Sequence, residues 1–227
     1  MCSRYAYTYS WEELQQLLSS LRSPVSISKR YNLAPTQKAP VIRLHSDSSL
    51  KLDFLHWGLI PYFAVEPRAK LSMINARAET VASKPSFRAA FKSRRCIVPV
   101  SGFYEWKSLD DDSGSQPYYI KSSDQKPLLL AGLHESWGAK EPVLETFAII
   151  TIAANELFNS IHDRMPLILE PEDCKKWINP ETSVEEASQF LTPSIIHPLE
   201  IYPVSTFVNS DKNDDPKCIE RIEIAGN

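Results

Sequence analysis

The second residue of the chain is a cysteine, and this position gives it chemistry that an internal cysteine lacks. Removal of Met1, which is common before a small residue, would leave Cys2 with a free α-amine beside its thiol. α-Amines have pKa values of about 7.7–8.0 and thiols of about 8.5, so both are partly nucleophilic near neutral pH. Such a pair can trap an aldehyde, because the amine forms a Schiff base and the thiol closes a thiazolidine ring. The alternative is a frayed terminus in which the cysteine has no role.

Three polar residues in other parts of the chain are suited to proton transfer or substrate orientation. Glu105 lies between aromatic residues, where shielding from water would raise the pKa of its carboxyl; alternatively, it faces solvent on a strand. His162 follows a predicted helix and can exchange protons near neutral pH, or it can cap that helix. Asn75 could orient a substrate oxygen, and Arg77, two residues later, could hold a phosphate.

The cysteines and charges of the chain exclude several classes of protein. Cys2, Cys96, Cys174 and Cys218 form no C-x-x-C pair and have no histidine at metal spacing, so we expect neither disulfides, nor a metal, nor a cofactor. The net charge of −3 argues against a wholly basic nucleic-acid binder. Residues 1–100 nevertheless contain 15 Lys and Arg against 6 Asp and Glu, and the remainder 10 against 22. A basic face is therefore possible if the fold gathers the cations of the first half.

Hydrophobic periodicity predicts the elements that must position these residues. Ser10 and Glu13 have the spacing of a capping box, and leucines at helical spacing predict a helix over 11–22. Further helices are predicted at 85–93, 154–161, 171–178 and 183–191. Strands are predicted at 40–46, 50–57, 96–100, 103–106, 117–121, 128–133, 146–152 and 199–204, with a polar loop at 110–116.

These strands do not alternate regularly with helices, which predicts an α+β fold rather than a doubly wound one. We expect a single domain over 1–227, with a mixed, mainly antiparallel β-sheet or barrel and peripheral helices. The polar segment near 209–217 is predicted to be mobile. There is no apolar run of the roughly 20 residues that a membrane span needs and no signal peptide, so we expect an intracellular protein without membrane contact.

Six short motifs resemble, in the same order, the motifs of the SRAP (SOS-response-associated peptidase) family. They are Met1-Cys2-Ser3-Arg4 and the segments 31–36, 57–61, 75–80, 102–106 and 162–166. That family binds single-stranded DNA and cross-links to abasic sites through an N-terminal cysteine. The resemblance therefore implies the SRAP fold, a role in the DNA damage response, and an abasic-site aldehyde as the target of Cys2.

The resemblance also implies roles for individual residues. Cys2, Asn75, Glu105 and His162 would form the active site, with Glu105 assisting Schiff-base formation and His162 assisting sugar-ring opening and adduct reversal. Arg4 and Arg77 would hold phosphates, Thr151 matches a further site position assigned to DNA binding, and Tyr62 and Phe63 stand where the family has an aromatic wedge. Those two aromatics could instead pack in the core. Ser3 departs from the family's usual glycine.

Two other functions remain open beside the cross-linking reaction and its lyase-type chemistry. One is a cysteine hydrolase with Cys2 as nucleophile and His162 as base, of which self-removal of Met1 would be one example. The other is a non-covalent single-strand binder that does not need Cys2. The expected partner is single-stranded DNA with abasic sites, bound by a monomer, in the cytoplasm or nucleoid of a bacterium or the nucleus of a eukaryote.

Overall fold

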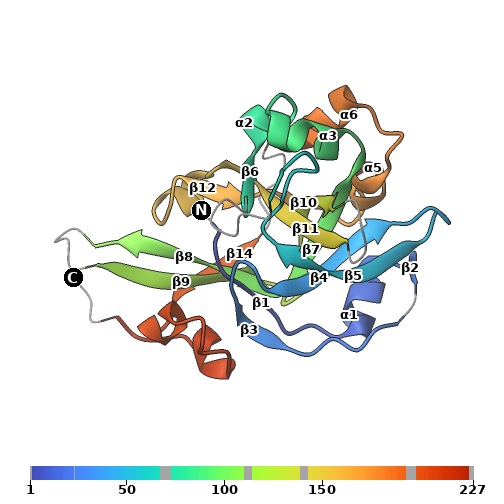
Figure 1. Ribbon diagram of the computed structural model, residues 1–227. Helices are drawn as coiled ribbons and strands as arrows, with labels where there is room; N and C mark the ends of the chain where they lie inside the picture. The colour runs from blue at the N-terminus through green and yellow to red at the C-terminus, as the bar shows by residue number, and fades with distance from the viewer. Residues whose placement is uncertain are drawn as a thin grey trace.

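Two β-sheets form the body of the protein, and short helices lie at their margins (Figure 1). The structure is a computed structural model that describes residues 2–22, 24–66, 73–109, 114–138, 143–192 and 198–224. The smaller sheet has the order β14 (Leu199–Pro203), β9 (Ser115–Ser122), β8 (Gly102–Ser108), β1 (Tyr5–Tyr7) and β3 (Arg30–Leu33). All of its pairings are antiparallel.

The larger sheet curls into a closed five-stranded barrel. Its path is β12 (Arg164–Pro166), β11 (Leu144–Ala153), β10 (Leu128–Trp137), β7 (Arg95–Val100), β4 (Lys38–Leu44), β5 (Leu50–Trp57) and β2 (Leu21–Arg22). A parallel pairing of β5 with β11 closes the barrel. Two short strands, β13 (Ile168–Leu169) and β6 (Asn75–Arg77), join β10 and β11 respectively. The predicted mixed, mainly antiparallel α+β fold is therefore confirmed.

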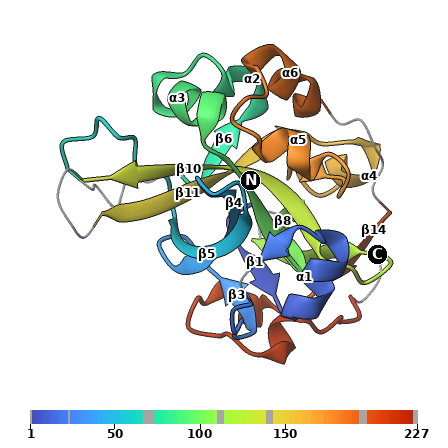
Figure 2. The ribbon, with the colours of Figure 1, turned by 90° about the vertical axis from the view of Figure 1, so that its right-hand side faces the viewer.

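The helices cover the outside of the barrel (Figure 2). They are α1 (Trp11–Leu17), α2 (Ala78–Val81), α3 (Pro85–Ser93), α4 (Glu156–Asn159), α5 (Cys174–Ile178) and α6 (Val184–Ser188), with 3-10 turns η2 (Gln189–Leu191), η3 (Thr206–Asn209) and η4 (Pro216–Ile219). α2, α3 and α5 pack against β11, β10 and β7. Within the described part of the chain, no helix is long and apolar enough to cross a membrane.

The helix predicted over 11–22 is only partly correct. Ser10 forms the expected capping box with Glu13, but the helix ends at Leu17. Leu18 leaves the helical conformation, and Leu21 begins β2 by pairing with Leu50 of β5. Leu18 and Leu21 are both buried, so the strand satisfies the same apolar positions that suggested a longer helix.

Several other predicted boundaries agree with the structure and some do not. The helix at 85–93 is confirmed as α3, and the strands at 40–46 and 50–57 correspond to β4 and β5. The helices predicted at 154–161 and 171–178 are shorter, because the structure begins α4 at Glu156 and α5 at Cys174. Of the loop predicted at 110–116, positions 115 and 116 belong to β9, whereas 110–113 lie outside the described residues.

One hydrophobic core extends through both sheets, since Tyr5 and Phe103 of the smaller sheet belong to the same buried cluster as Trp57 and Phe147 of the barrel. Gly102, at the start of β8, allows this close packing. A Cβ atom there would lie 2.4 Å from Cζ of Tyr119 and 2.6 Å from the carbonyl oxygen of Ile120. The glycine therefore sets the position of the strand that carries Glu105.

Hydrogen bonds tie the polar segment near 209–217 to β3. The buried side-chain amide of Asn32 donates to three carbonyl oxygens of residues 208–213 at 2.7–3.0 Å. Asp214 accepts the main-chain N–H of Tyr31 at 2.6 Å and forms an ion pair with Arg30. These bonds oppose the mobility that the composition of this segment predicts.

Candidate functional site

Strand β11 brings together two of the segments that carry candidate residues. Thr151 of β11 pairs with Arg77 of β6 on one side and with Pro166 of β12 on the other. The motif with Asn75 and the motif with His162, far apart in sequence, therefore flank the same strand. In Figure 1, β6 and β12 lie close together at the end of the barrel above β8.

Cys2 joins this group through the strand that follows it. The side-chain amide of Asn75 donates a hydrogen bond of 2.8 Å to the carbonyl oxygen of Cys2. The main-chain N–H of Tyr104 donates to the carbonyl oxygen of Arg4 at 3.0 Å, which aligns β1 with the part of β8 that carries Glu105. The structure thus places Cys2, Asn75 and Glu105 in one neighbourhood.

Glu105 is only 2% exposed, so the solvent-facing alternative is wrong. Burial raises the pKa of its carboxyl to about 7, which makes it an effective proton donor and acceptor near neutral pH. Cys2 is fully buried as well. Burial, together with the negative charge of Glu105, raises the pKa of the Cys2 thiol well above its usual value, so the thiol is protonated at neutral pH.

The ring of His162 has two partners at the same nitrogen. Nδ1 accepts the main-chain N–H of Arg164 at 2.9 Å and lies 2.8 Å from a carboxylate oxygen of Asp163. The first contact requires a lone pair on Nδ1, and the second requires a proton there. Burial lowers the pKa of His162, which favours the neutral ring, and the Arg164 N–H at Nδ1 favours the tautomer with its proton on Nε2. The main-chain N–H of His162, rather than its ring, bonds to the carbonyl oxygen of Phe158 in α4.

An ion pair that the sequence analysis did not identify connects the two flanks of β11. Arg164 binds Glu79 through two contacts, Nη1 to Oε1 at 2.6 Å and Nη2 to Oε2 at 3.0 Å. Its Nη2 also donates to the carbonyl oxygen of Thr151 at 2.6 Å. The hydrogen bond from Arg164 lowers the pKa of Glu79. Both residues lie within the motifs noted in the sequence, but their partnership requires the pairing of β6 and β12 with β11.

The two arginines predicted to hold phosphates differ in their surroundings. Arg77 is exposed. Arg4 is half-buried, and its Nη1 donates to Oδ1 of Asn32 at 2.8 Å and to the carbonyl oxygen of Val208 at 3.0 Å. Burial lowers the pKa of Arg4. Arg4 therefore fastens β1 to β3 and η3, whereas Arg77 presents its charge to solvent.

Thr151 and the two wedge aromatics also differ from one another. Thr151 is fully buried, with its hydroxyl 3.4 Å from Nη2 of Arg164, so its side chain is not on the surface of the protein. Tyr62 is 61% exposed and Phe63 is 53% exposed, which shows that the core-packing alternative is wrong. Their rings are in edge-to-face contact, with the two ring centroids 5.3 Å apart.

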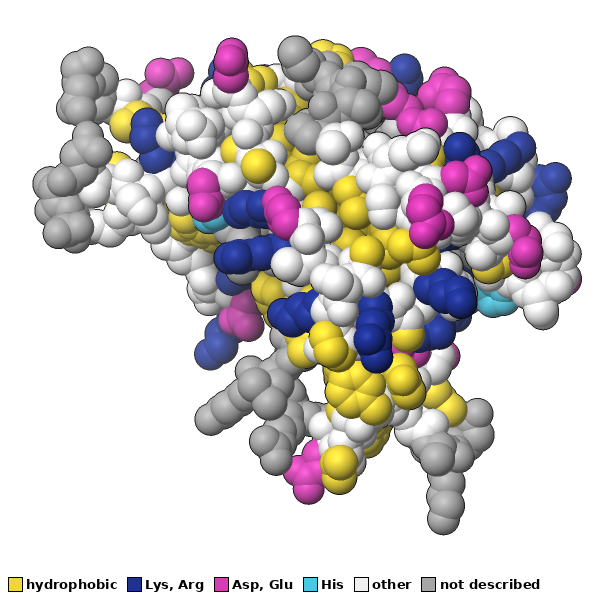
Figure 3. Space-filling view, turned by 90° about the horizontal axis from the view of Figure 1, so that it is seen from above, with side chains coloured by type: hydrophobic (Ala, Val, Ile, Leu, Met, Phe, Trp, Pro, Cys, Tyr) yellow, Lys and Arg dark blue, Asp and Glu magenta, His cyan; other side chains and the backbone are white. Residues whose placement is uncertain are grey.

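A basic cavity of about 670 Å³ adjoins this site. Its lining includes Asn75 and Arg77 of β6, Thr80 of α2, and Ser83 and Lys84 before α3. On the face seen from above in Figure 3, Lys and Arg side chains gather beside a band of hydrophobic side chains. Within the described ranges, no cluster of His, Cys, Asp and Glu has a metal-binding arrangement.

Comparison with known proteins gives the family. The model of the SOS response associated peptidase (SRAP) family matches residues 1–211, and the chain belongs to this family. It is 40% identical over 224 residues to the abasic site processing protein YoqW of Bacillus subtilis (strain 168), covering 97% of this chain and 99% of that protein. It is 31% identical over 230 residues to the abasic site processing protein YedK of Escherichia coli (strain K12), covering 98% and 100%.

The fold has a close counterpart among solved structures. A crystal structure of a protein from Bacteroides thetaiotaomicron superimposes with a TM-score of 0.84 at 29% sequence identity, covering 98% of this chain and 100% of that one. The barrel and its attached sheet are thus a shared architecture.

Proposed function

We propose that this protein binds single-stranded DNA and, after loss of Met1, forms a covalent thiazolidine adduct between Cys2 and the aldehyde of an abasic site. The observation that carries the proposal is the position of Cys2, hydrogen-bonded to Asn75 beside a buried carboxyl with a pKa of about 7. The names of the relatives, which are abasic site processing proteins, support the same substrate. The adduct would shield the lesion during the response to DNA damage.

The reaction needs neither an oxidant nor a metal. The Cys2 amine adds to the aldehyde carbon of the ring-opened deoxyribose, and loss of one water molecule gives a Schiff base. The sulfur then adds to the same carbon, its proton passes to the nitrogen, and a five-membered ring results. Aldehyde and N-terminal cysteine thus yield thiazolidine and water, with no change in oxidation state.

Glu105 is suited to the proton transfers of this sequence. With a pKa of about 7, its carboxyl is available in both forms near neutral pH. As a carboxylate it takes protons from the amine or the thiol, and as an acid it donates to the departing hydroxyl. The thiol needs such help because its own pKa is strongly raised by burial.

His162 is suited to opening the sugar ring. Its lowered pKa and the Arg164 N–H at Nδ1 favour the tautomer that carries a proton on Nε2. In this role, the Nε2–H donates a hydrogen bond to the ring oxygen of the deoxyribose and stabilises the charge that develops there. The ring oxygen takes a proton from water and the C1′ hydroxyl gives one up to water, so the aldehyde forms with no net change in protonation. The same group assists reversal of the adduct, since the reverse reaction passes through the same intermediates.

The charge and aromatic surface support binding of a single strand. Arg77 and Lys84 offer cations to phosphates in the basic cavity, and Tyr62 and Phe63 offer exposed rings on which bases can stack. Arg4 is bound within the protein and acts mainly by holding β1 in place. We therefore assign phosphate contact first to Arg77.

Loss of Met1 is the condition for this chemistry, and the chain could remove it by self-cleavage. Cys2 is fully buried in the full-length chain, so adduct formation also requires the thiol to become accessible. A cysteine hydrolase acting on other proteins is less well supported. Such an enzyme uses a thiolate, whereas burial keeps this thiol protonated.

The test is to incubate the purified protein with a single-stranded oligonucleotide that contains one abasic site and to measure an adduct that resists denaturation. Mass spectrometry of the same sample establishes whether Met1 is absent. We expect the adduct with the wild type and none of comparable stability with Cys2→Ala or Cys2→Ser. A stable adduct with either variant would contradict the thiazolidine, and binding without any adduct would favour the non-covalent binder.

The supporting residues are tested with the same assay. We expect Glu105→Gln and His162→Ala to slow formation or reversal of the adduct without loss of DNA binding. Unchanged kinetics in both variants would remove these residues from the mechanism.

A further inference from the structure

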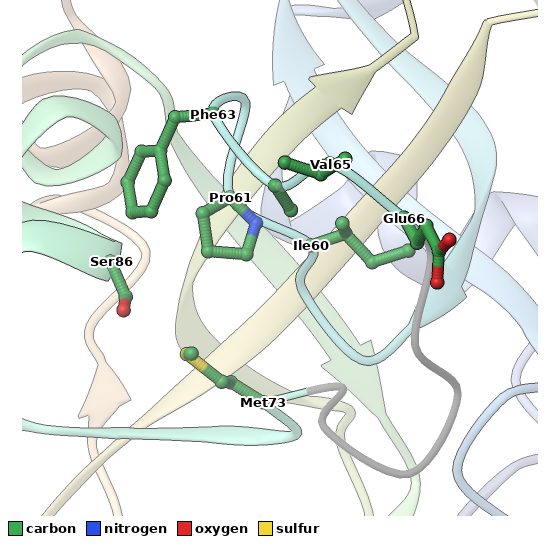
Figure 4. A pocket seen from close by; sticks show the side chains of 8 residues that line it. Ile60, Pro61, Phe63, Val65, Glu66, Met73 and Ser86 are labelled. Carbon is green, nitrogen blue, oxygen red and sulfur yellow. The ribbon is translucent and has the colours of Figure 1, made fainter.

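A second cavity, of about 520 Å³, lies beside the exposed aromatic pair (Figure 4). Its lining is mainly apolar, with two polar side chains. The lining includes Ile60, Pro61, Phe63, Glu66, Met73 and Ser86. In Figure 4, Phe63 and Ser86 lie on one side, Ile60 and Glu66 on the other, and Met73 below. Among the described residues its lining contains no Lys or Arg such as a phosphate site has, and the cavity is open to solvent, unlike a core void.

This apolar cavity and the basic cavity are immediate neighbours. Ser86, in the first turn of α3, lines the apolar cavity, while Lys84 and Phe87 line the basic one. In the same way, Met73 lines the apolar cavity and Asn75 lines the basic one. Met73 and Asn75 are two residues apart, which is at most roughly 7 Å along an extended chain, so one nucleotide is long enough to reach from one cavity lining to the other.

The charges of the two cavities favour opposite ends of a nucleotide. Arg77 and Lys84 line the basic cavity and attract a phosphate. Glu66, the charged residue among those that line the apolar cavity, repels a phosphate but accepts hydrogen bonds. Asn75 lies in the basic cavity and bonds to Cys2, so this phosphate would be next to the reacting sugar.

We propose that the apolar cavity binds the nucleobase adjacent to the abasic site, while Arg77 and Lys84 hold the phosphate that links the two nucleotides. This proposal rests on the proposed function and adds a preference for lesion context. Phe63 and Met73 supply the apolar contacts for the base. A carboxylate such as that of Glu66 accepts hydrogen bonds and cannot donate them. The cavity therefore favours the exocyclic amino group of cytosine over thymine, whose one donor, N3–H, lies between two carbonyl oxygens that repel a carboxylate.

The first experiment removes the neighbouring base. Each oligonucleotide carries one abasic site. In the reference both neighbours are cytosine, and in the other two a stable base-free spacer replaces the neighbour on one side or the other. The initial rate of adduct formation is measured at DNA concentrations below saturation. We expect the spacer to slow the reaction roughly tenfold on one side of the lesion and little on the other. If wild-type protein forms the adduct at the same rate whichever neighbour is removed, the cavity does not bind a base. If it forms no adduct with any oligonucleotide, the proposed function itself is wrong.

A pair of variants locates the effect. Ser86→Phe places a ring in the cavity from a partly exposed position of α3, and Ser93→Phe makes the same change at the exposed end of the same helix, outside both cavities. We expect Ser86→Phe to react at the slow rate on both oligonucleotides and Ser93→Phe to behave like the wild type. Retention of the full response to the neighbouring base in a folded Ser86→Phe overturns the proposal. If Ser86→Phe melts at a lower temperature than Ser93→Phe, the proposal is judged on the response of the wild-type protein to removal of the neighbouring base.

The second experiment tests the class of base. With cytosine or thymine as the neighbour on the responsive side, we expect wild-type protein to react roughly three- to tenfold faster with cytosine. Glu66→Gln can both donate and accept, so this difference should disappear in the variant. Equal rates with both pyrimidines in the wild type overturn the preference for an amino group.

Discussion

At the scale of single residues, burial decides the chemistry of this site. Glu105 and Cys2 are both shielded from water, and the pKa of each is raised, the carboxyl to about 7 and the thiol far above its usual value. The pKa of His162 is lowered by burial. The thiol and the imidazole are therefore held mainly in their uncharged forms, whereas the carboxyl is present in both its forms near neutral pH and can exchange protons with them.

The buried carboxyl should also make folding stability depend on pH. The pKa of Glu105 is about 7 in the folded protein and 4.5 in the reference state, so between these values the folded state holds a proton that the unfolded state has lost. The contribution of Glu105 to stability is therefore fully present below pH 4.5 and is lost as the pH rises through 7. We expect wild type to lose about 2–3 kcal/mol more than Glu105→Gln between pH 5 and pH 8 in urea unfolding. The same pH dependence in both proteins would contradict the burial of an ionisable carboxyl.

At the scale of elements, the site depends on how short strands are fixed against β11. β6 and β12 each contribute three residues and bracket β11 near Thr151. The Glu79–Arg164 ion pair connects α2 with β12, and the Arg164 main-chain N–H holds Nδ1 of His162. We therefore expect Glu79 to act as a positioning residue, through Arg164.

Loss of this ion pair should disturb the reaction more than the fold. Glu79 is half-exposed, so we expect Glu79→Gln to change the melting temperature little. We expect adduct formation to slow roughly three- to tenfold, with the rate constant affected more than the concentration of DNA that gives half the maximal rate. Glu12→Gln, at an exposed position of α1, is the matched control. Equal rates in the two variants would show that Arg164 does not need Glu79.

Substitution of Gly102 tests the packing that positions β8. A methyl group there would meet the ring of Tyr119 and the main-chain oxygen of Ile120, and the latter has no rotamer with which to move away. We expect Gly102→Ala to destabilise the protein by about 2–3 kcal/mol in thermal or urea unfolding. A variant as stable as wild type would mean that β8 and β9 can separate at no cost.

At the scale of the whole molecule, charge is distributed so that an acidic protein can present a basic surface. The net charge is −3, yet the first hundred residues supply most of the cations, among them Arg77 and Lys84 of the basic cavity. Affinity for intact DNA should therefore be modest, with selectivity arising from the covalent step.

The salt dependence of binding measures how many phosphates are held. Binding of a single-stranded oligonucleotide should weaken as salt rises, because bound cations are released. We expect Arg77→Ala to reduce the slope of log affinity against log salt by about 0.7, the value for one phosphate contact. Arg22→Ala, an exposed position on β2 away from β6, should leave the slope unchanged. A slope that does not differ between the two variants would remove Arg77 from the phosphate contacts.

Much of this protein could be predicted from its sequence. Apolar runs predicted the strands that became β4, β5, β10 and β11, and the ordered motifs indicated Cys2, Asn75 and Glu105, which lie in one neighbourhood. The roles of these residues and of His162 stay predictions. Local patterns carry this information because side-chain periodicity follows directly from backbone geometry. The helix at 11–22 was overestimated for the same reason, since buried leucines fit either a helix or a strand.

Only the tertiary structure decided which polar groups are buried and which meet across the chain. The internal hydrogen bonds of Arg4, the exposure of Tyr62 and Phe63, and the Glu79–Arg164 pair all depend on contacts between distant segments. The same holds for the apolar and basic cavities, which lie on either side of the first turn of α3. The sequence by itself determined that Cys2 could react, whereas burial and strand pairing decided which acid, which amide and which cavity surround it.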